Sequence, residues 1–148
     1  MVARISLKID GEVFLAELLD KKAPKTVAAI SNLLPYERKV IHARFSGEAI
    51  WVPLPEDFPV NTGHENPTSY PSRGELLYYP GFTSEKEILI PYGSAIFASK
   101  VGLLPGNHFA TIREGLDRLE KLGQRVLWEG AKQIVIDLEN NRSGKTES

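Results

Sequence analysis

The fold prediction for this sequence starts from one stretch, Ile41-His-Ala-Arg-Phe-Ser-Gly-Glu-Ala-Ile-Trp-Val-Pro-Leu54. Its centre, Gly47-Glu48, predicts a two-residue hairpin loop, because glycine in the first loop position favours a type II′ turn. Side chains then alternate between the two faces of the sheet. One face is apolar and consists of Ile41, Ala43, Phe45, Ile50, Val52 and Leu54. The other face presents His42, Arg44, Ser46 and Trp51. The hairpin therefore predicts a core on one side and a binding surface on the other, with Arg44 opposite Trp51.

The patterns before this hairpin predict a second hairpin and a helix. Residues 5–9 and 12–18 read as two half-buried strands, and Asp10-Gly11 between them suits a type I′ turn. The helix is expected over residues 22–35, because Pro24 suits a first helical turn and apolar residues follow at helical spacing.

The patterns after the hairpin predict more strands and a late helix. Residues 55–74 are rich in proline and show no period, so we expect a long loop that borders the polar hairpin face. Strands are expected over residues 75–80, 86–92 and 133–138, while residues 95–101 fit a strand or a turn. Thr111 and Glu114 have the spacing of a capping box for the late helix, and Gly123 is expected to end it.

Together these elements predict a mainly β fold. Many short strands separated by turns favour a closed β-barrel, here of about eight strands with two helices, because closure removes exposed sheet edges. Residues 1–138 are expected to form one domain, and residues 139–148 a flexible C-terminal tail without apolar residues.

Composition excludes several classes of protein. The chain of 148 residues has a formal net charge of −1, which provides no field for nucleic acid. It has no cysteine, which excludes disulfides and thiol chemistry and fits the cytoplasm. The N-terminus lacks the apolar run of a signal peptide, and no apolar stretch approaches the roughly 20 residues of a membrane span.

The order of elements resembles the cyclophilin-like fold. Three motifs support the resemblance: Ala23-Pro-Lys-Thr26 at the early helix, Ile41-His-Ala-Arg44 in a strand, and Thr111-Ile-Arg-Glu-Gly-Leu116 before the late helix. From Ile5 to about Leu138 the chain looks like a bacterial family of uncharacterised cyclophilin-like proteins. Its marks are residues 20–25, 41–48, 74–80, 87–93 and 106–112.

The resemblance implies the fold more strongly than an activity. In prolyl isomerases of this fold, a Phe-His-Arg strand supplies the arginine that polarises the prolyl peptide. Here Arg44 lies one residue later, and a one-residue shift moves a strand side chain to the opposite face unless a bulge compensates. Ser46-Gly-Glu-Ala-Ile-Trp51 also replaces the glutamine-containing stretch of those enzymes, so isomerase activity is not the favoured prediction.

The candidate site residues follow from the polar hairpin face. Arg44 is the expected anion clamp and Trp51 the stacking wall, with Ser46 beside them. His42 and His108 are the candidate catalytic groups, because imidazole exchanges protons near neutral pH. Among the carboxylates Glu48, Glu75, Glu85 and Glu87, only Glu75 is placed near Arg44. The expected aromatic wall consists of Tyr79, Tyr92 and Phe97.

No metal or cofactor is expected. The three histidines lie on separate segments without metal-ligand spacing, and no phosphate-binding or dinucleotide motif is present. The chain is thus expected to bind a small anionic molecule in a cleft on the polar hairpin face. One alternative is an enzyme, either a weak prolyl isomerase or one acting on a small carboxylate. The other is a structural protein that self-associates through Trp51 and exposed tyrosines, so a homo-oligomer remains open.

Overall fold

The computed structural model describes residues 3–59, 62–82 and 84–139. The helices are α1 (Pro24–Leu33) and α2 (Leu116–Glu129). The strands are β1 (Arg4–Ile9), β2 (Glu12–Leu18), β3 (Tyr36–His42), β4 (Gly47–Pro53), β5 (Pro67–Thr68), β6 (Glu75–Tyr79), β7 (Glu87–Ala95), β8 (Ala98–Ser99), β9 (Gly102–Leu103), β10 (Gly106–Glu114) and β11 (Lys132–Leu138).

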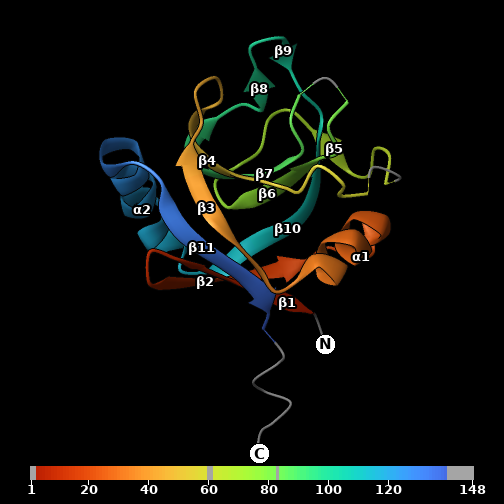
Figure 1. Ribbon diagram of the computed structural model, residues 1–148, viewed down its shortest axis with the longest axis horizontal. Coiled ribbons are helices and arrows are strands. Elements are labelled where there is room, and N and C mark those ends of the chain that lie inside the picture. Colours follow the sequence, from red (N-terminus) through yellow and green to blue (C-terminus); the bar gives the residue numbers. More distant parts are fainter. Residues whose placement is uncertain (1–2, 60–61, 83, 140–148) are drawn as a thin grey trace, which may run out of the picture.

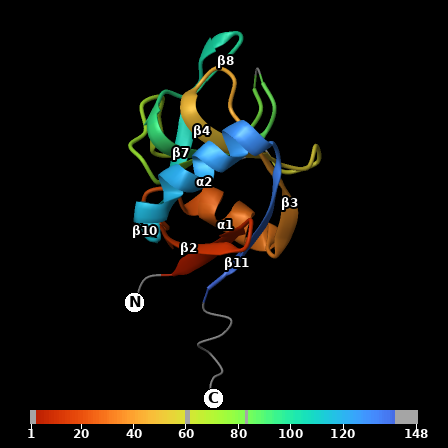
Figure 2. The same ribbon diagram turned by 90° about the vertical axis from the view of Figure 1, so that its left-hand side faces the viewer.

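Eight strands form a closed antiparallel barrel in the order β2-β1-β11-β3-β4-β7-β6-β10, and β10 pairs with β2 to close it. The short β5 adds to β10, while β8 and β9 form a separate small hairpin at the top of Figure 1. The two helices lie on opposite sides of the barrel in Figure 1, and in the turned view of Figure 2 α2 lies in front with α1 behind it. The buried faces of both helices belong to the main core. The prediction of a mainly β fold, a closed barrel of about eight strands with two helices, is confirmed for the described residues.

The N-terminal hairpin has the predicted register and turn. Leu7 lies opposite Phe14, and both side chains are completely buried. Asp10 and Gly11 both have positive φ angles, 51° and 85°, as a type I′ turn requires.

The first helix begins at Pro24, the residue predicted for its first turn, and it is shorter than the predicted range of residues 22–35. A distant side chain provides the hydrogen bonds at its N-terminus. Ala23 provides no side-chain cap. Instead the carboxylate of Glu65, in the long loop, accepts hydrogen bonds from the backbone N–H groups of Thr26 (2.8 Å) and Lys25 (3.1 Å) and from the Thr26 hydroxyl (2.9 Å). Asn107 on β10 in turn accepts a hydrogen bond from the Glu65 N–H at 3.1 Å. The proline-rich loop is therefore fastened to both α1 and the barrel.

The predicted boundaries of the second helix are wrong at both ends. Thr111 and Glu114 lie in β10, and α2 starts only after Gly115, whose φ of 95° turns the chain out of the strand. Gly123 lies inside α2 and is buried, and the helix ends at Gly130. The glycine at position 123 serves close packing: a Cβ there would lie 2.2 Å from the ring of Tyr92.

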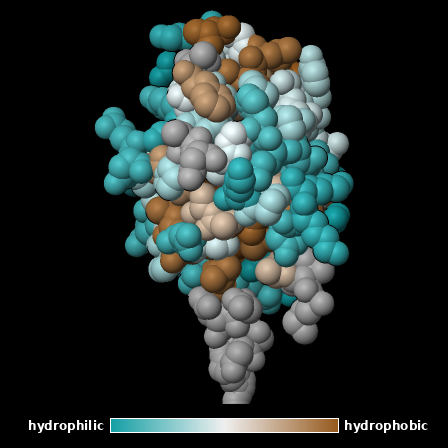
Figure 3. Space-filling view, turned by 90° about the vertical axis from the view of Figure 1, so that its right-hand side faces the viewer, coloured by the Kyte–Doolittle hydropathy of each residue, from teal (hydrophilic) through white to brown (hydrophobic). Residues whose placement is uncertain are grey.

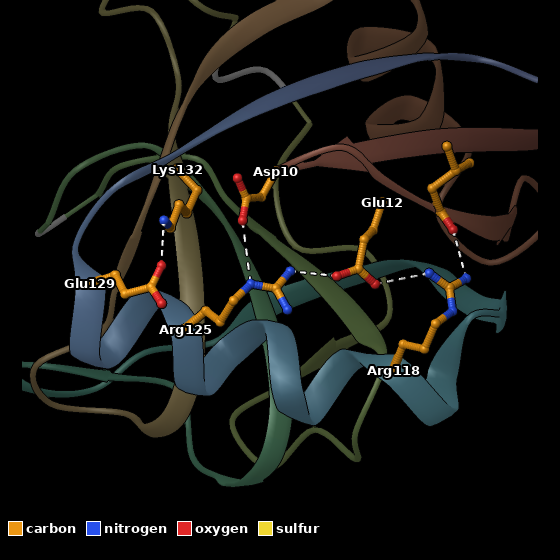
Figure 4. Close-up of polar contacts among 7 residues, drawn as sticks. Asp10, Glu12, Arg118, Arg125, Glu129 and Lys132 are labelled. Carbon is orange, nitrogen blue, oxygen red and sulfur yellow. Dashed lines mark hydrogen bonds and ion pairs between the residues drawn. The ribbon is translucent and has the colours of Figure 1, made fainter.

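Charged side chains fasten α2 to the N-terminal hairpin (Figure 4). Glu12 accepts hydrogen bonds from Arg125 and, at 3.1 Å, from Arg118, while Arg125 also reaches Asp10 at 3.3 Å. The hydrogen bond from Arg125 lowers the pKa of Glu12 below its ordinary value, and this outweighs the partial burial of the carboxylate.

The central hairpin forms, but the predicted Gly47-Glu48 loop and its register are wrong. Strand β3 ends at His42 and β4 begins at Gly47, so four residues, 43–46, connect them. Trp51 pairs with Ile41, and His42 pairs with Ile50. Trp51 consequently faces outward beside Ile41, whereas Arg44 lies in the connection. Gly47 is the first residue of β4, and its φ of 93° favours glycine there.

This register leaves the wall formed by β4, β6 and β7 apolar on both faces. The inner face joins the main core. The outer face is covered by an outer cluster of buried residues: Ala49, Leu77, Tyr79, Leu89, Phe97 and Leu104. Periodicity cannot separate the two faces of such a strand, because nearly every residue along it is apolar. Neither helix in the described part of the chain is long and apolar enough to cross a membrane.

Candidate functional site

A cleft of about 680 Å³ lies beside the outer cluster, on the outer face of the barrel wall. Its walls come from the connection between β3 and β4, from β4 and β7, from the segment before β7, and from β8 with the residue after it. We call it the outer cleft. The lining side chains that matter most for its chemistry are Arg44, Trp51, Phe82, Glu85, Glu87 and Lys100.

One side of the outer cleft is aromatic and aliphatic. Trp51 is half-buried and pairs with Leu89 of β7, which is 1% exposed. Phe82 is 55% exposed, and its ring lies 6.2 Å from that of Tyr79 in an edge-on arrangement. Partly exposed rings beside a buried aliphatic floor suit the flat apolar part of a small molecule.

Two cations line the same cleft. Arg44 and Lys100 are both exposed, one from the β3–β4 connection and the other just after β8. Among the residues that the structure describes, neither side chain forms an ion pair or a hydrogen bond. Their donors therefore remain open to an anion, and the planar guanidinium can bind a carboxylate with two parallel bonds.

The most unusual group in the outer cleft is the carboxyl of Glu87. It lies on β7 between Pro53 and Tyr79, and the residue is only 8% exposed. No side chain in the described ranges gives this carboxyl a hydrogen bond or an ion pair. Burial, together with the nearby charge of Glu85, raises the pKa of Glu87 to about 8. At neutral pH the group is mainly protonated and can exchange its proton.

Ser46 and His42 border the outer cleft, but local structure occupies their polar atoms. The Ser46 hydroxyl exchanges two hydrogen bonds of 3.1 Å with the backbone of Ala98 and so ties the β3–β4 connection to β8. His42 Nδ1 lies 2.8 Å from the Ala43 carbonyl oxygen and Nε2 lies 2.7 Å from the Tyr92 hydroxyl. Because a carbonyl oxygen only accepts, Nδ1 donates to Ala43, and the Tyr92 hydroxyl occupies the hydrogen-bonding position at Nε2.

The expected aromatic wall is divided between two cores and does not line the outer cleft. Tyr79 and Phe97 are buried in the outer cluster, with ring centroids 5.7 Å apart. Tyr92 belongs to the main core, where burial, and after it the charges of Glu48 and Glu120, raise its pKa. The aromatic lining comes instead from Trp51 and Phe82.

Glu75 and His108 also lie outside the outer cleft. Glu75 accepts a hydrogen bond from the Ser72 N–H at 2.8 Å. His108 Nε2 lies 2.8 Å from the Thr111 hydroxyl, and burial lowers the pKa of this imidazole. The structure therefore brings Arg44 and Trp51 into the lining of one cleft, and it places Glu75 and His108 elsewhere.

The expected arginine–tryptophan stack and the expected border of the site are corrected. Arg44 is not the cross-strand neighbour of Trp51, and the cation–π pair found in the described ranges joins Arg118 to Phe14. No described residue of the loop 55–74 lines the outer cleft, because that loop is held at α1 and β10.

Glu87 lines the outer cleft and Glu75 does not, although the sequence pattern favoured Glu75 as the neighbour of Arg44. A signal was present: Glu87 begins Glu-Ile-Leu-Ile, a run whose lack of alternation indicates a strand covered on both faces. A carboxylate in such a strand is buried on whichever face it lies.

The residues expected to support self-association lie partly inside the protein. Trp51 is half-buried, and Tyr78, Tyr79 and Tyr92 are buried, while Tyr70 is 67% exposed. In Figure 3 apolar residues gather at the top of the molecule, the end at which β8 and β9 lie in Figure 1. Exposed residues in and beside these two strands are Ile96, Val101 and Leu103.

Within the described ranges, no group of three His, Asp or Glu side chains is placed to hold a metal ion. The ionisable groups that line the outer cleft are His42, Arg44, Glu85, Glu87 and Lys100. The outer cleft can therefore bind an anion through its two cations, Arg44 and Lys100. Its buried carboxyl, Glu87, can bind a hydrogen-bond donor or a cation.

Comparison with solved structures shows the fold. A structure of McbB in complex with tryptophan is similar to this chain with a TM-score of 0.74 at 19% identity, over 97% of this chain and 46% of McbB. This chain thus spans less than half the length of McbB. A hypothetical protein from Archaeoglobus fulgidus has a TM-score of 0.63 at 18% identity, over 92% of this chain and 94% of its own.

A cyclophilin-type peptidyl-prolyl cis-trans isomerase from Cryptosporidium parvum has a TM-score of 0.57 at 15% identity, covering 96% of this chain and 100% of its own. At such identities the likeness concerns the fold and not the activity. A search of curated proteins gave no match.

Residues 5–137 match one protein family. This range includes every strand of the barrel, apart from Arg4 at the start of β1 and Leu138 at the end of β11. The chain belongs to the DUF3830 family, described as proteins of unknown function.

Proposed function

We propose that this protein binds a small anionic molecule with a flat apolar body in the outer cleft. The observation that supports this most directly is the shared lining: Arg44 and Lys100 lack partners among the described residues, and Trp51 lies in the same cleft. In this arrangement the anionic group contacts the two cations, and the apolar body lies against the indole and Leu89.

The charge of the lining is consistent with an anionic ligand. With Glu87 protonated at neutral pH, Arg44 and Lys100 outnumber the one remaining carboxylate, Glu85. Among similar folds, McbB has been solved with tryptophan, a carboxylate that bears an indole. That observation belongs to McbB, and here it serves to choose the first compounds to test.

Thermal unfolding of the whole chain tests the proposal. The probes are indole-3-propionate and phenylacetate, with acetate as a carboxylate that lacks an apolar body. We expect the aromatic carboxylates to raise the unfolding temperature and acetate to have little effect, because binding to the folded state alone stabilises it.

Two variants show where the probes bind. Arg44→Ala should abolish the stabilisation, whereas Arg73→Ala, which removes an exposed arginine outside the outer cleft, should leave it unchanged. Equal stabilisation of wild type and Arg44→Ala would rule out Arg44 as the anion clamp.

An enzyme acting on a small carboxylate is the second candidate, and Glu87 is the observation that favours it. A buried carboxyl with a pKa of about 8 is suited to transfer protons at neutral pH. If Glu87 acts in this way, turnover of a bound carboxylate should disappear in Glu87→Gln while Arg44-dependent binding persists. Turnover that survives in Glu87→Gln would refute this role.

A further inference from the structure

The buried carboxyl of Glu87 needs a hydrogen-bond donor or a cation when it is ionised, and the proposed anionic ligand does not provide one. Its residue is 92% buried, since 8% is exposed, and no described side chain donates a hydrogen bond to it. A carboxylate in such a place is strongly destabilised unless a donor or a cation accompanies it. Because it lines the outer cleft, a ligand can reach it.

Among the described residues, no side chain supplies a cation to this carboxyl. Arg44 and Lys100 line the same cleft but form no ion pair with Glu87. The strand neighbours of Glu87 are Pro53 and Tyr79, and the nearby charge is that of another carboxylate, Glu85. His42, the remaining ionisable group of the lining, uses both ring nitrogens in other contacts.

We infer that the ligand of the outer cleft is amphoteric: an ammonium group contacts the carboxyl of Glu87, and a carboxylate of the same molecule contacts Arg44 and Lys100. Apolar and aromatic amino acids are the simplest molecules of this class, since their side chain would lie against Trp51. This inference rests on the proposed function and adds the cationic half of the ligand.

The binding step has a defined proton balance. Free Glu87 is mainly protonated at neutral pH, because its pKa is raised to about 8. When an ammonium group arrives, the carboxyl gives its proton to the buffer and becomes a carboxylate paired with the ammonium. No covalent bond of the ligand forms or breaks. Binding at pH 7 should therefore release about one proton per ligand, and the release should fade above pH 8 as the free carboxyl loses its proton.

Isothermal titration calorimetry with the full chain tests the inference. The three probes share an indole: tryptophan has both charged groups, indole-3-propionate only the carboxylate, and tryptamine only the ammonium. Titrations in two buffers of different ionisation enthalpy give the number of protons released. We expect tryptophan to bind at least about tenfold more tightly than either of the other probes and to release about one proton at pH 7.

Two variants assign the effect to the carboxyl. Glu87→Gln keeps the size of the side chain and removes the exchangeable proton, so it should abolish both the proton release and the advantage of tryptophan over indole-3-propionate. Glu75→Gln, a carboxylate outside the outer cleft, should change neither. Thermal unfolding of both variants confirms that they are folded.

The outcomes distinguish the two proposals. If indole-3-propionate binds as tightly as tryptophan and no proton is released, the amphoteric ligand is wrong while anion binding stands. If none of the three probes binds, the proposed function fails, and the inference that rests on it fails too. Tight tryptophan binding that Glu87→Gln leaves unchanged would also overturn the inference, because the ammonium would then be held elsewhere.

Discussion

The hydroxyl oxygen of Tyr92 lies 2.7 Å from Nε2 of His42, and the two rings meet nearly edge-on with centroids 5.6 Å apart. Tyr92 is 1% exposed and His42 is half-buried, so water cannot fully replace this hydrogen bond. The pair joins the end of β3 to β7 across β4, at the point where the chain turns into the connection that holds Arg44.

Removing the Tyr92 hydroxyl should destabilise the protein. We expect Tyr92→Phe to lower the free energy of unfolding by about 1–2 kcal/mol, because the half-buried imidazole then loses the hydrogen-bond partner of one nitrogen. Urea unfolding measures this change. Tyr70→Phe, at a site that is 67% exposed, serves as the control and should behave as wild type. Equal stability of Tyr92→Phe and wild type would contradict the importance of this bond.

The ring of Tyr92 also explains the glycine in α2. Ala in place of Gly within a helix ordinarily raises stability by up to about 1 kcal/mol. Here the new Cβ would lie 2.2 Å from the Tyr92 ring, so Gly123→Ala should instead lower the free energy of unfolding by about 1–3 kcal/mol. Gln124→Ala, one position along the same helix, is the control for helix propensity. A more stable Gly123→Ala protein would show that the ring can move aside.

Glu65 should stabilise the fold in a pH-dependent way. Partial burial raises the pKa of its carboxylate, but the hydrogen bonds from Thr26 and Lys25 together outweigh burial and lower it. The stabilisation is therefore complete above pH 4.5 and is lost as the pH falls through the lower pKa of the folded state.

We expect Glu65→Ala to cost about 1–2 kcal/mol at pH 7, the range of a lost helix cap, and less well below pH 4.5. Urea unfolding at the two pH values measures the difference. Glu56→Ala, an exposed residue of the same loop, is the matched control. A deficit that is the same at both pH values would exclude the charged form of Glu65 as its source.

Glu87 should have the opposite pH dependence. Its pKa rises from an ordinary 4.5 to about 8 on folding, so the folded state holds a proton that the unfolded state has lost between these values. The free energy of unfolding should consequently fall as the pH rises from 4.5 to 8, by about 2–5 kcal/mol in total.

Glu87→Gln should remove this dependence, so the variant is expected to match wild type below pH 4.5 and to be more stable above pH 8. Thermal and urea unfolding across this range test it, with Asp57→Asn at an exposed position as the control. A wild-type profile that the substitution leaves unchanged would show that Glu87 is ionised in the folded protein.

The barrel could be predicted because local chemistry and tertiary structure agree along most of its strands. Asp10-Gly11 suits a type I′ hairpin turn, and the alternation of residues 5–9 fits a strand with one face buried. The register of the central hairpin could not be predicted, because its four-residue connection contains no glycine or proline, while Gly47 at the start of β4 looks like a turn centre. Tertiary contacts fix the position of this connection: the Ser46 hydroxyl is hydrogen-bonded to Ala98, which is 52 residues away in the sequence.

The candidate site was predictable only in part for the same reason. Arg44 and Trp51 share the outer cleft even though the register that suggested it was wrong, since both remain near the same end of the hairpin. Glu87 lies on the wall itself, and Lys100 lies in the segment 95–104 that packs over the wall. The two residues line one cleft because of contacts between segments that are distant in the sequence. A single sequence does not reveal which face of β7 this segment covers.

The closure of the barrel has a consequence for how the chain folds. The N-terminal hairpin pairs on one side with β11, where Ile5 lies opposite Leu138, and on the other with β10, where Ala16 lies opposite Ile112. These pairings join elements that lie far apart in the sequence, so contact order is high and loop-closure entropy opposes the early steps. During synthesis the edges of the first hairpin stay uncovered until β10 and β11 have left the ribosome. Folding of the barrel should therefore be slow, and it can be completed only once β11 has emerged.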